Sequence, residues 1–543
     1  MIGSTEKAPG AGKRFFSGVV ILSCATLVVK AIGVFFKIPM IALIGLEGMG
    51  YFNAAYHFFS LLMTVSTAGL PVALSILVSR DNAVGSIPNT RRDFRVALVI
   101  FGLCGAVLSV AMFLSSDSLA SAMQIDKTAL CLRAVAPAVL CITVSGAIRG
   151  YFQGFEIMYP TAVSEVIEAV GKLCFGLSFA LYAINKGYEP YVVAAYAIAG
   201  LTLGVIVSMV YLIINKLVFE RRQSRAHPRT LPTESVKSVA LALCRTALPV
   251  TLSSAVLSLT TLFDTMIIPS ALMNSGLNSD AAFNLYSTYT NLAVPMFGFP
   301  TAFMVPLSLA LVPAVVSAAR IKDGDAEQRV MNSSFRLCGI MALPCTFGLA
   351  VMAEPILQMM FLSQSDAIPI AAPLLSILSA SIFFSGLMTV SNSMLQAYGH
   401  QMMPIASLAV GALVKVLSEW LLVSIPEINI YGAPISTFLC TTAIMMMNFG
   451  FLAKVTGNKV APIKVFLPTL ICSALSATVP IIAYHFLYPI MHQALATIVS
   501  ILMTAIFYAL LVIKSGALPT SELLLFPFGE RLCGVLRKLK LIK

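Results

Sequence analysis

The distribution of apolar residues along the chain predicts a polytopic α-helical membrane protein. Apolar runs of about 20 residues recur throughout the sequence, and each is long enough to cross a hydrocarbon core of roughly 30 Å as a helix. A transmembrane β-barrel would instead show alternating segments of about ten residues. By the length criterion, we expect about 14 transmembrane helices, which lie near residues 15–44, 51–80, 94–115, 129–153, 160–182, 191–215, 239–271, 281–317, 333–362, 367–396, 403–424, 433–453, 463–487 and 490–513.

The polar segments between these runs support the span count and indicate an orientation. Lys and Arg concentrate in alternate segments, the longest of which is 216–237. The remaining segments hold almost only Lys127 and Lys186 beside several acidic residues. By the positive-inside rule, the basic segments are cytoplasmic. The first span follows Lys13 and Arg14 and is expected to be uncleaved, so both termini are expected in the cytoplasm.

The composition excludes several other classes of protein. Of 543 residues, 58% are hydrophobic and only 11% are charged, which is too little charge to cover the surface of a soluble protein. The net charge of +12 lies in loops and forms no basic stripe interleaved with aromatic residues, so we expect no nucleic-acid partner. The 11 cysteines show no CxxC or Cys/His spacing, so no metal site is expected. No large outer loop with a DxD motif is present, so we expect no catalytic residues and no enzymatic activity.

Two pairs of segments indicate an internal repeat. The stretches "YFQGFEIMYPTAVSEVIEAVGK" (151–172) and "MLQAYGHQMMPIASLAVGALVK" (394–415) both run from a Gln through a short turn and a Pro to a Lys. The segments 35–43 and 265–273 also match. We therefore expect two six-helix lobes in the same orientation, a basic cytoplasmic linker between them, two additional helices and a basic amphipathic cytoplasmic tail. The predicted bounds are 1–215 for the N-terminal lobe, 216–238 for the linker, 239–455 for the C-terminal lobe, 456–513 for the additional helices and 514–543 for the tail.

Charged residues within the apolar runs are candidate functional residues, because a charge at membrane depth is costly. Lys30 and Lys37 are seven residues apart and share a helix face. The run around them is too long for a straight span, so we expect the helix to bend around Gly33 and Pro39 and to keep both lysines inside the protein. The alternative is that Lys37 extends to the outer surface and Lys30 pairs with a neighbour.

Two further groups of charges lie in corresponding spans of the repeat. Glu165, Glu168 and Lys172 are spaced i, i+3 and i+7, and Lys415 and Glu419 are spaced i and i+4, so each group occupies one face of a helix. One interpretation is a charge network that couples transport to an ion. The other is a self-neutralised cluster that holds helices together.

Asp264 and Arg149 complete the candidate set. Asp264 is a counter-ion, a coupling-ion ligand or a structural acceptor, and Arg149 is either an anion contact or an anchor at the cytoplasmic interface. Several cations in one cavity suit an anionic substrate such as a phosphate or pyrophosphate. The candidate substrate-binding residues are Lys30, Lys37, Arg149, Lys172 and Lys415. The candidate coupling or charge-network residues are Glu165, Glu168, Asp264 and Glu419.

The stretch "KAIGVFFKIPMIALIGLEGMGYFNAAYHFFSLLMTVSTAGLPVALSILVSR" (30–80) resembles the opening of stage V sporulation protein B and MviN/MurJ-type flippases. These belong to the multidrug/oligosaccharidyl-lipid/polysaccharide (MOP) exporter superfamily. "RGYFQGFEIMYPTAVSEVIE" and "YGAPISTFL" also look like this family. The resemblance implies a bacterial inner-membrane flippase with two six-helix lobes, two further helices and alternating access around a cationic cavity. It also implies that Lys30 and Lys37 match basic positions of the family's first helix.

The resemblance implies a substrate whose sugar is linked to undecaprenyl diphosphate, such as lipid II, and membrane lipids as surroundings. Arginines within the spans 51–80 and 281–317 are a MurJ feature that this sequence lacks, apart from Arg80 at the end of the first. This departure favours the sporulation-protein branch or another lipid-linked glycan. The alternative is a MATE-like, cation-coupled exporter of organic cations. We expect no cofactor, and the candidate driving force is Na⁺, H⁺ or the membrane potential. Cell-wall synthases are candidate partners. The sequence does not indicate an oligomeric state.

Overall fold

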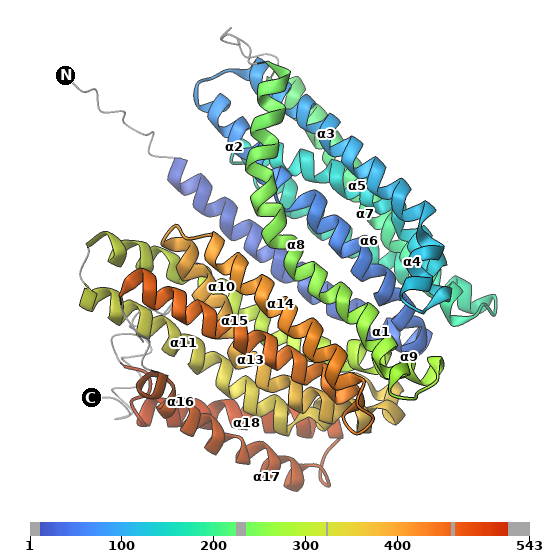
Figure 1. The fold of residues 1–543 in the computed structure, drawn as a ribbon, viewed down its shortest axis with the longest axis vertical. Coiled ribbons are helices and arrows are strands. Elements are labelled where there is room, and N and C mark those ends of the chain that lie inside the picture. The colour runs from blue at the N-terminus through green and yellow to red at the C-terminus, as the bar shows by residue number, and fades with distance from the viewer. Residues whose placement is uncertain (1–10, 224–234, 322–323, 458–461, 520–543) are drawn as a thin grey trace. The chain divides into compact units, whose positions relative to one another are not determined.

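The computed structural model describes residues 11–223, 235–321, 324–457 and 462–519, and its described residues are helical with short connections (Figure 1). Some side chains within these ranges, including that of Lys30, fall outside the description. The helices are α1 (Ala11–Thr67), α2 (Leu70–Ala83), α3 (Ile87–Leu114), α4 (Ser116–Ala122), η1 (Asp126–Thr128), α5 (Ala129–Gly154), α6 (Tyr159–Asn185), α7 (Pro190–Gln223), α8 (Val236–Asn274), α9 (Ser279–Thr288), η2 (Tyr289–Ala293), α10 (Val294–Ile321), α11 (Gly324–Val351), α12 (Ala353–Met360), η3 (Leu362–Ala367), α13 (Ile368–Ala397), α14 (Met402–Val423), η4 (Asn429–Tyr431), α15 (Gly432–Thr456), α16 (Pro462–Ser476), α17 (Thr478–Leu487) and α18 (Gln493–Lys514).

The all-helical membrane fold predicted from the apolar runs is confirmed. Among the described residues, 12 helical stretches are long and apolar enough to cross a membrane. One of these stretches, Ala31–Ala83, contains a turn of the chain at Gly45, described below. The count of 14 spans stays a prediction.

The chain divides into two compact units, 1–269 and 270–543. The first unit has a core in which α2, α3, α5, α7 and the first part of α8 meet. Tyr151 of α5 is fully buried there, and its ring lies 5.0 Å from that of Phe94 and 5.1 Å from that of Phe155, measured between centroids. Because Val239 and Leu243 of α8 are buried in the same core, the first part of α8 packs with the first unit.

The N-terminal helix α1 folds back on itself at Gly45. This residue has φ 70° and ψ −179°, a conformation essentially restricted to glycine. The rings of Phe36 and Phe52 lie 5.7 Å apart, although sixteen residues of straight helix would separate them by about 24 Å. The helix is therefore not broken at Gly33 or Pro39, and the predicted bend at these residues stays a prediction. The helix continues through both residues, because each keeps helical backbone angles, and the chain reverses at Gly45 instead.

The helices α6 and α7 approach each other closely through glycines. A Cβ atom on Gly204 of α7 would lie 2.9 Å from the backbone of both Gly171 and Lys172 of α6. Only glycine allows this approach, and it fixes the middle of α6 against α7. At its start, α6 carries Pro160 in the first turn, where the missing N–H costs no hydrogen bond.

The second unit has a separate core, formed by α10, α11, α13, α15 and α16. Phe335 of α11 and Leu452 of α15 are fully buried in it. Buried Asn448 of α15 donates hydrogen bonds to Ser391 Oγ at 3.0 Å and to Asn392 Oδ1 at 2.7 Å on α13.

The predicted linker and tail fall largely outside the described residues. The helix α7 extends to Gln223, so the first part of the predicted linker 216–238 is helical, and α8 starts at Val236. Residues 224–234 lie outside the description, as does the predicted amphipathic tail beyond residue 519.

Candidate functional site

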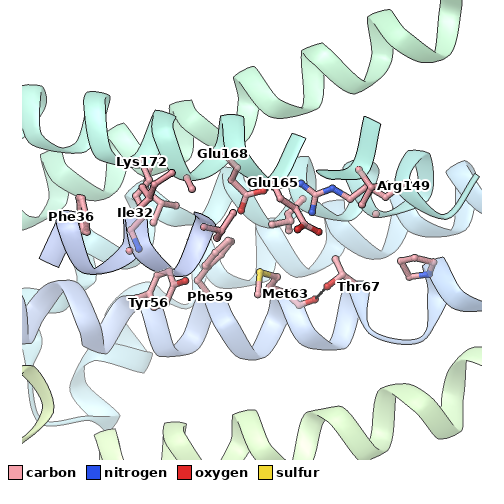
Figure 2. Close-up of a pocket in the computed structure, with 18 of the residues that line it drawn as sticks. Ile32, Phe36, Tyr56, Phe59, Met63, Thr67, Arg149, Glu165, Glu168 and Lys172 are labelled. Atoms are coloured by element: carbon pink, nitrogen blue, oxygen red, sulfur yellow. Dashed lines mark hydrogen bonds and ion pairs between the residues drawn. The ribbon is translucent and has the colours of Figure 1, made fainter. Parts of the chain in front are cut away.

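A cavity of about 590 Å³ lies within the first unit. Both arms of α1 line it, together with α5 and α6, and shorter contributions come from α2 and α7 (Figure 2). Its volume falls in the range of roughly 300–1,000 Å³ that is usual for small-molecule sites. Its charged lining residues are Arg149, Glu165, Glu168 and Lys172.

Arg149 of α5 forms the best-defined polar contacts in this cavity. Its Nη2 donates to Glu168 Oε2 at 3.0 Å and its Nε donates to Ser164 Oγ at 3.0 Å. The Arg149 and Glu168 side chains are 15% and 27% exposed, so the ion pair is partly shielded but accessible from the cavity. Glu165 lines the same wall and interacts electrostatically with both partners. One carboxylate of α6 thus pairs with the guanidinium of α5, and a second interacts with it electrostatically.

Lys172 occupies the other part of the charged wall, inside a cluster of aromatic rings. Its Nζ lies 4.6 Å from the ring centroid of Tyr56, 4.8 Å from that of Phe36 and 5.6 Å from that of Phe52. All three rings come from α1, two of them from the arm after Gly45. Cation–π attraction favours the charged ammonium at these distances. The reversal of α1 therefore builds the aromatic surroundings of the Lys172 ammonium.

Of the two lysines in the first predicted span, the structure describes the side chain of Lys37 but not that of Lys30. Lys37 is half-buried and close enough to Lys172 for their charges to repel each other. The side chain of Lys30 lies outside the described residues, so its role stays a prediction.

The cavity lining does not include Lys37, Asp264, Lys415 or Glu419. Asp264 is half-buried on α8, and the next residue, Thr265, has its Oγ1 2.7 Å from His57 Nδ1. Lys415 and Glu419 lie on α14 in the second unit and are 8% and 1% exposed. Among the described residues, no group of His, Cys, Asp and Glu could hold a metal ion.

The corresponding lysines of the proposed repeat occupy the same position in their helices. Lys172 lies 13 residues after the first residue of α6 (172 minus 159), and Lys415 lies 13 residues after that of α14 (415 minus 402). Each follows a four-residue connection from the preceding long helix. This agreement supports the duplication inferred from sequence.

The aromatic part of the site was not predicted from the sequence. Phe52, Tyr56 and Phe59 are spaced i, i+4 and i+7 in "YFNAAYHFF", so they share one face of the second arm of α1. That spacing was the available signal. It carries little information alone, because aromatic stripes of this kind are common on packed helices.

The chain matches the family described as polysaccharide biosynthesis protein over residues 15–319, more than half of its length. Stage V sporulation protein B of Bacillus subtilis (strain 168) is 27% identical over 462 residues, which cover 84% of this chain and 86% of that protein. Lipid II flippase MurJ of the same organism is 23% identical over 457 residues, 82% of this chain and 83% of that protein.

Two solved structures show the same fold at 14% sequence identity. The inward closed conformation of lipid II flippase MurJ has a TM-score of 0.68 and covers 91% of this chain and 98% of that chain. The inward-facing conformation of a multidrug resistance MATE family transporter of the MOP superfamily has a TM-score of 0.62 and covers 81% and 98%. These likenesses and the family match confirm the resemblance inferred from sequence, and the chain belongs to the polysaccharide biosynthesis protein family.

Proposed function

We propose that this protein is a flippase that moves an undecaprenyl-diphosphate-linked cell-wall or polysaccharide precursor from the inner to the outer leaflet of the bacterial cytoplasmic membrane. The proposal rests on the cavity of the first unit. Two cationic side chains, those of Arg149 and Lys172, line this cavity within a multi-pass membrane protein. The relatives named as stage V sporulation protein B and lipid II flippase MurJ support this function. It is transport rather than enzymatic catalysis.

The two cations suit a diphosphate. The planar guanidinium of Arg149 can hold a phosphate through two parallel hydrogen bonds, and the ammonium of Lys172 acts as a point charge. Glu168, the present partner of Arg149, lies one helical turn before Lys172, about 6 Å along the axis of α6. A diphosphate and its first sugar can bridge that separation. Lys37 interacts electrostatically with Lys172 and adds positive charge near it.

Transport then proceeds by alternating access of the cavity to the two sides of the membrane. The lipid tail stays in the bilayer while the polar head group crosses within the protein. Asp264 and Glu419 are not among the residues that line the cavity and are candidates for coupling to Na⁺, H⁺ or the membrane potential, whereas Lys415 stays a candidate substrate-binding residue. Cell-wall synthases are candidate partners, and we expect both termini in the cytoplasm.

A second candidate function is export of organic cations. The observation that favours it is the composition of the same cavity, where Glu165 and Glu168 lie near several aromatic rings. Carboxylates and aromatic faces bind organic cations. This function predicts that replacing the two glutamates abolishes transport and that neutralising Lys172 leaves it intact.

Complementation distinguishes the two functions. A bacterium depleted of its lipid II flippase would receive the wild-type chain, Lys172→Met, or Lys186→Met as a matched control. Lys186 follows the last residue of α6 and has its own aromatic neighbour, with Nζ 5.8 Å from the Tyr182 ring centroid, but it does not line the cavity. Rescue by wild type and Lys186→Met but not by Lys172→Met supports the flippase. Raised resistance to organic cations without rescue supports the exporter.

A further inference from the structure

The ion pair between Arg149 and Glu168 occupies the position that an anionic substrate needs. Arg149 is the cavity residue with the geometry for two-point phosphate binding, and its Nη2 is already bonded to Glu168 Oε2 at 3.0 Å. Its Nε is engaged by Ser164 Oγ, also at 3.0 Å. Ser164 Oγ donates in turn to the backbone oxygen of Thr161 at 2.7 Å, so the hydroxyl is held in place by α6. An arriving phosphate would therefore compete with the carboxylate rather than with the hydroxyl.

We propose that Glu168 is an exchangeable internal counter-ion, which holds Arg149 in the empty cavity, is displaced by a phosphate of the substrate and takes up one proton when displaced. This inference rests on the proposed transport of a lipid-linked diphosphate. The proton comes from solvent, forms an O–H bond on the displaced carboxylate and returns to solvent when Glu168 recaptures Arg149. The carboxylate thus supplies part of the driving force for releasing the substrate.

The charges of the cavity support uptake of one proton. Among the described side chains that line the cavity, the charged ones are Arg149, Lys172, Glu165 and Glu168, whose charges cancel when all four are ionised. A diphosphate diester brings two further negative charges. With all four side chains ionised, the filled cavity would carry the two negative charges of the diphosphate in excess, which is costly away from bulk water. Protonation of Glu168 reduces this excess by one charge.

Other titratable groups near Glu168 could also make substrate binding depend on pH. From α1, Tyr56 interacts electrostatically with Glu168 and Lys37 with Lys172, and α5 contributes Arg149. On α6 itself the groups are Glu165 and Lys172. The helix α7 packs here through Gly204 and Ser208, and its first charged residue, Lys216, is paired at 3.2 Å with Glu220 farther along the helix. A lysine that lost its proton at high pH would also weaken anion binding, so the test must separate that cause from Glu168.

The test measures binding of undecaprenyl-diphosphate-N-acetylglucosamine to the full chain in nanodiscs between about pH 6 and about pH 8.5, where this diester keeps its charge. Wild type should bind more weakly as pH rises, by at most about tenfold per pH unit, the limit for one proton. Glu168→Gln should bind about tenfold more tightly than wild type at the upper end and should lose the pH dependence. A pH dependence that persists in Glu168→Gln would assign it to a lysine and overturn the inference.

Two controls locate the effect. Glu165→Gln removes the neighbouring carboxylate but leaves the Arg149–Glu168 pair, so the pH dependence should persist. Glu220→Gln removes an ion-paired carboxylate outside the cavity and should match wild type in affinity and slope. Loss of the slope in Glu165→Gln instead of Glu168→Gln would contradict the assignment. If Glu168→Gln does not fold, Glu168→Asp, which shortens the carboxylate by one methylene, should give an intermediate gain in affinity.

The outcomes also separate this inference from the proposed function. If wild type binds the probe with no pH dependence, Glu168 is a fixed structural partner joining α5 and α6, and the inference fails while the flippase proposal stands. If wild type does not bind the probe at any pH in this range, the diphosphate site and the inference fall together.

Discussion

Replacing Lys172 by Met should remove a large part of the affinity of the cavity for a diphosphate. Methionine keeps the length and the apolar character of the side chain and deletes only the charge. The ammonium now lies 4.6–5.6 Å from the ring centroids of Phe36, Phe52 and Tyr56. A thioether also packs well against aromatic rings, so the fold should be preserved.

The magnitude follows from the position of the ammonium. At a separation of about 4 Å and an effective dielectric constant of about 20, its Coulomb attraction to one phosphate charge is about 4 kcal/mol, which is an upper bound. Part of it is offset because the cation–π contacts weaken when the ammonium turns to the phosphate. A charge-assisted hydrogen bond is worth about 1.5–3 kcal/mol net. At 1.4 kcal/mol per factor of ten, the dissociation constant should rise about 10- to 150-fold.

The assay is binding of undecaprenyl-diphosphate-N-acetylglucosamine in nanodiscs, with Lys186→Met, directly after the end of the same helix, as the matched control. The control should change affinity by less than about twofold, because Lys186 lies outside the cavity lining. An unchanged dissociation constant for a folded Lys172→Met protein would refute the assignment of Lys172 to the diphosphate. Equal losses in both variants would show a general effect of net charge.

Three further predictions concern the framework of the site, each measured as the apparent free energy of unfolding in mixed micelles. Gly45→Ala should cost about 1–3 kcal/mol, because Gly45 has a backbone conformation that alanine avoids. Gly204→Leu should cost about 1–3 kcal/mol or more and should weaken diphosphate binding, because its side chain would press on the backbone of α6. A double-mutant cycle on Arg149→Ala and Glu168→Ala should give a coupling energy of about 1–2 kcal/mol, since the pair is partly shielded.

Each of these has its own check. Gly33→Ala is the control for Gly45→Ala, because a Cβ atom meets nothing within 4 Å at either position but Gly33 is helical. It should be neutral or stabilising by up to about 1 kcal/mol. Similar costs at both positions would contradict the reversal at Gly45. Additive effects of the Arg149 and Glu168 variants would show that the ion pair contributes nothing, and a tolerated Gly204→Leu would show that α6 and α7 can separate.

The helices were predictable because each apolar run carries its own signal. The length of the runs and the distribution of Lys and Arg indicated a multi-pass helical protein without any tertiary information. The reversal of α1 was harder to locate, because Gly33, Pro39 and Gly45 all interrupt the same run. A proline inside a helix kinks it without breaking it when neighbouring groups compensate for the lost backbone hydrogen bond. Gly45 instead has backbone angles that other residues rarely adopt.

The charged part of the candidate site was predictable because its residues lie within apolar runs. Glu165, Glu168 and Lys172 stand out in an apolar run, and their spacing places them on one face of α6. Arg149 could be nominated but its partner could not, because α5 and α6 contact each other only after folding. The aromatic residues around Lys172 do not stand out from the apolar residues beside them in the sequence. Only the structure therefore shows that their rings lie next to the ammonium.

Translocation of a lipid-linked precursor by the purified chain in proteoliposomes tests the proposed flippase activity directly. Undecaprenyl-diphosphate-N-acetylglucosamine would be placed in both leaflets, and its exposure to a sugar-modifying enzyme outside would be followed over time. We predict that wild type and Lys186→Met expose the inner pool and that Lys172→Met does so at least tenfold more slowly, in line with the loss of one phosphate contact. Equal exposure with Lys172→Met and wild type, or no exposure beyond that of empty liposomes with wild type, would contradict the account.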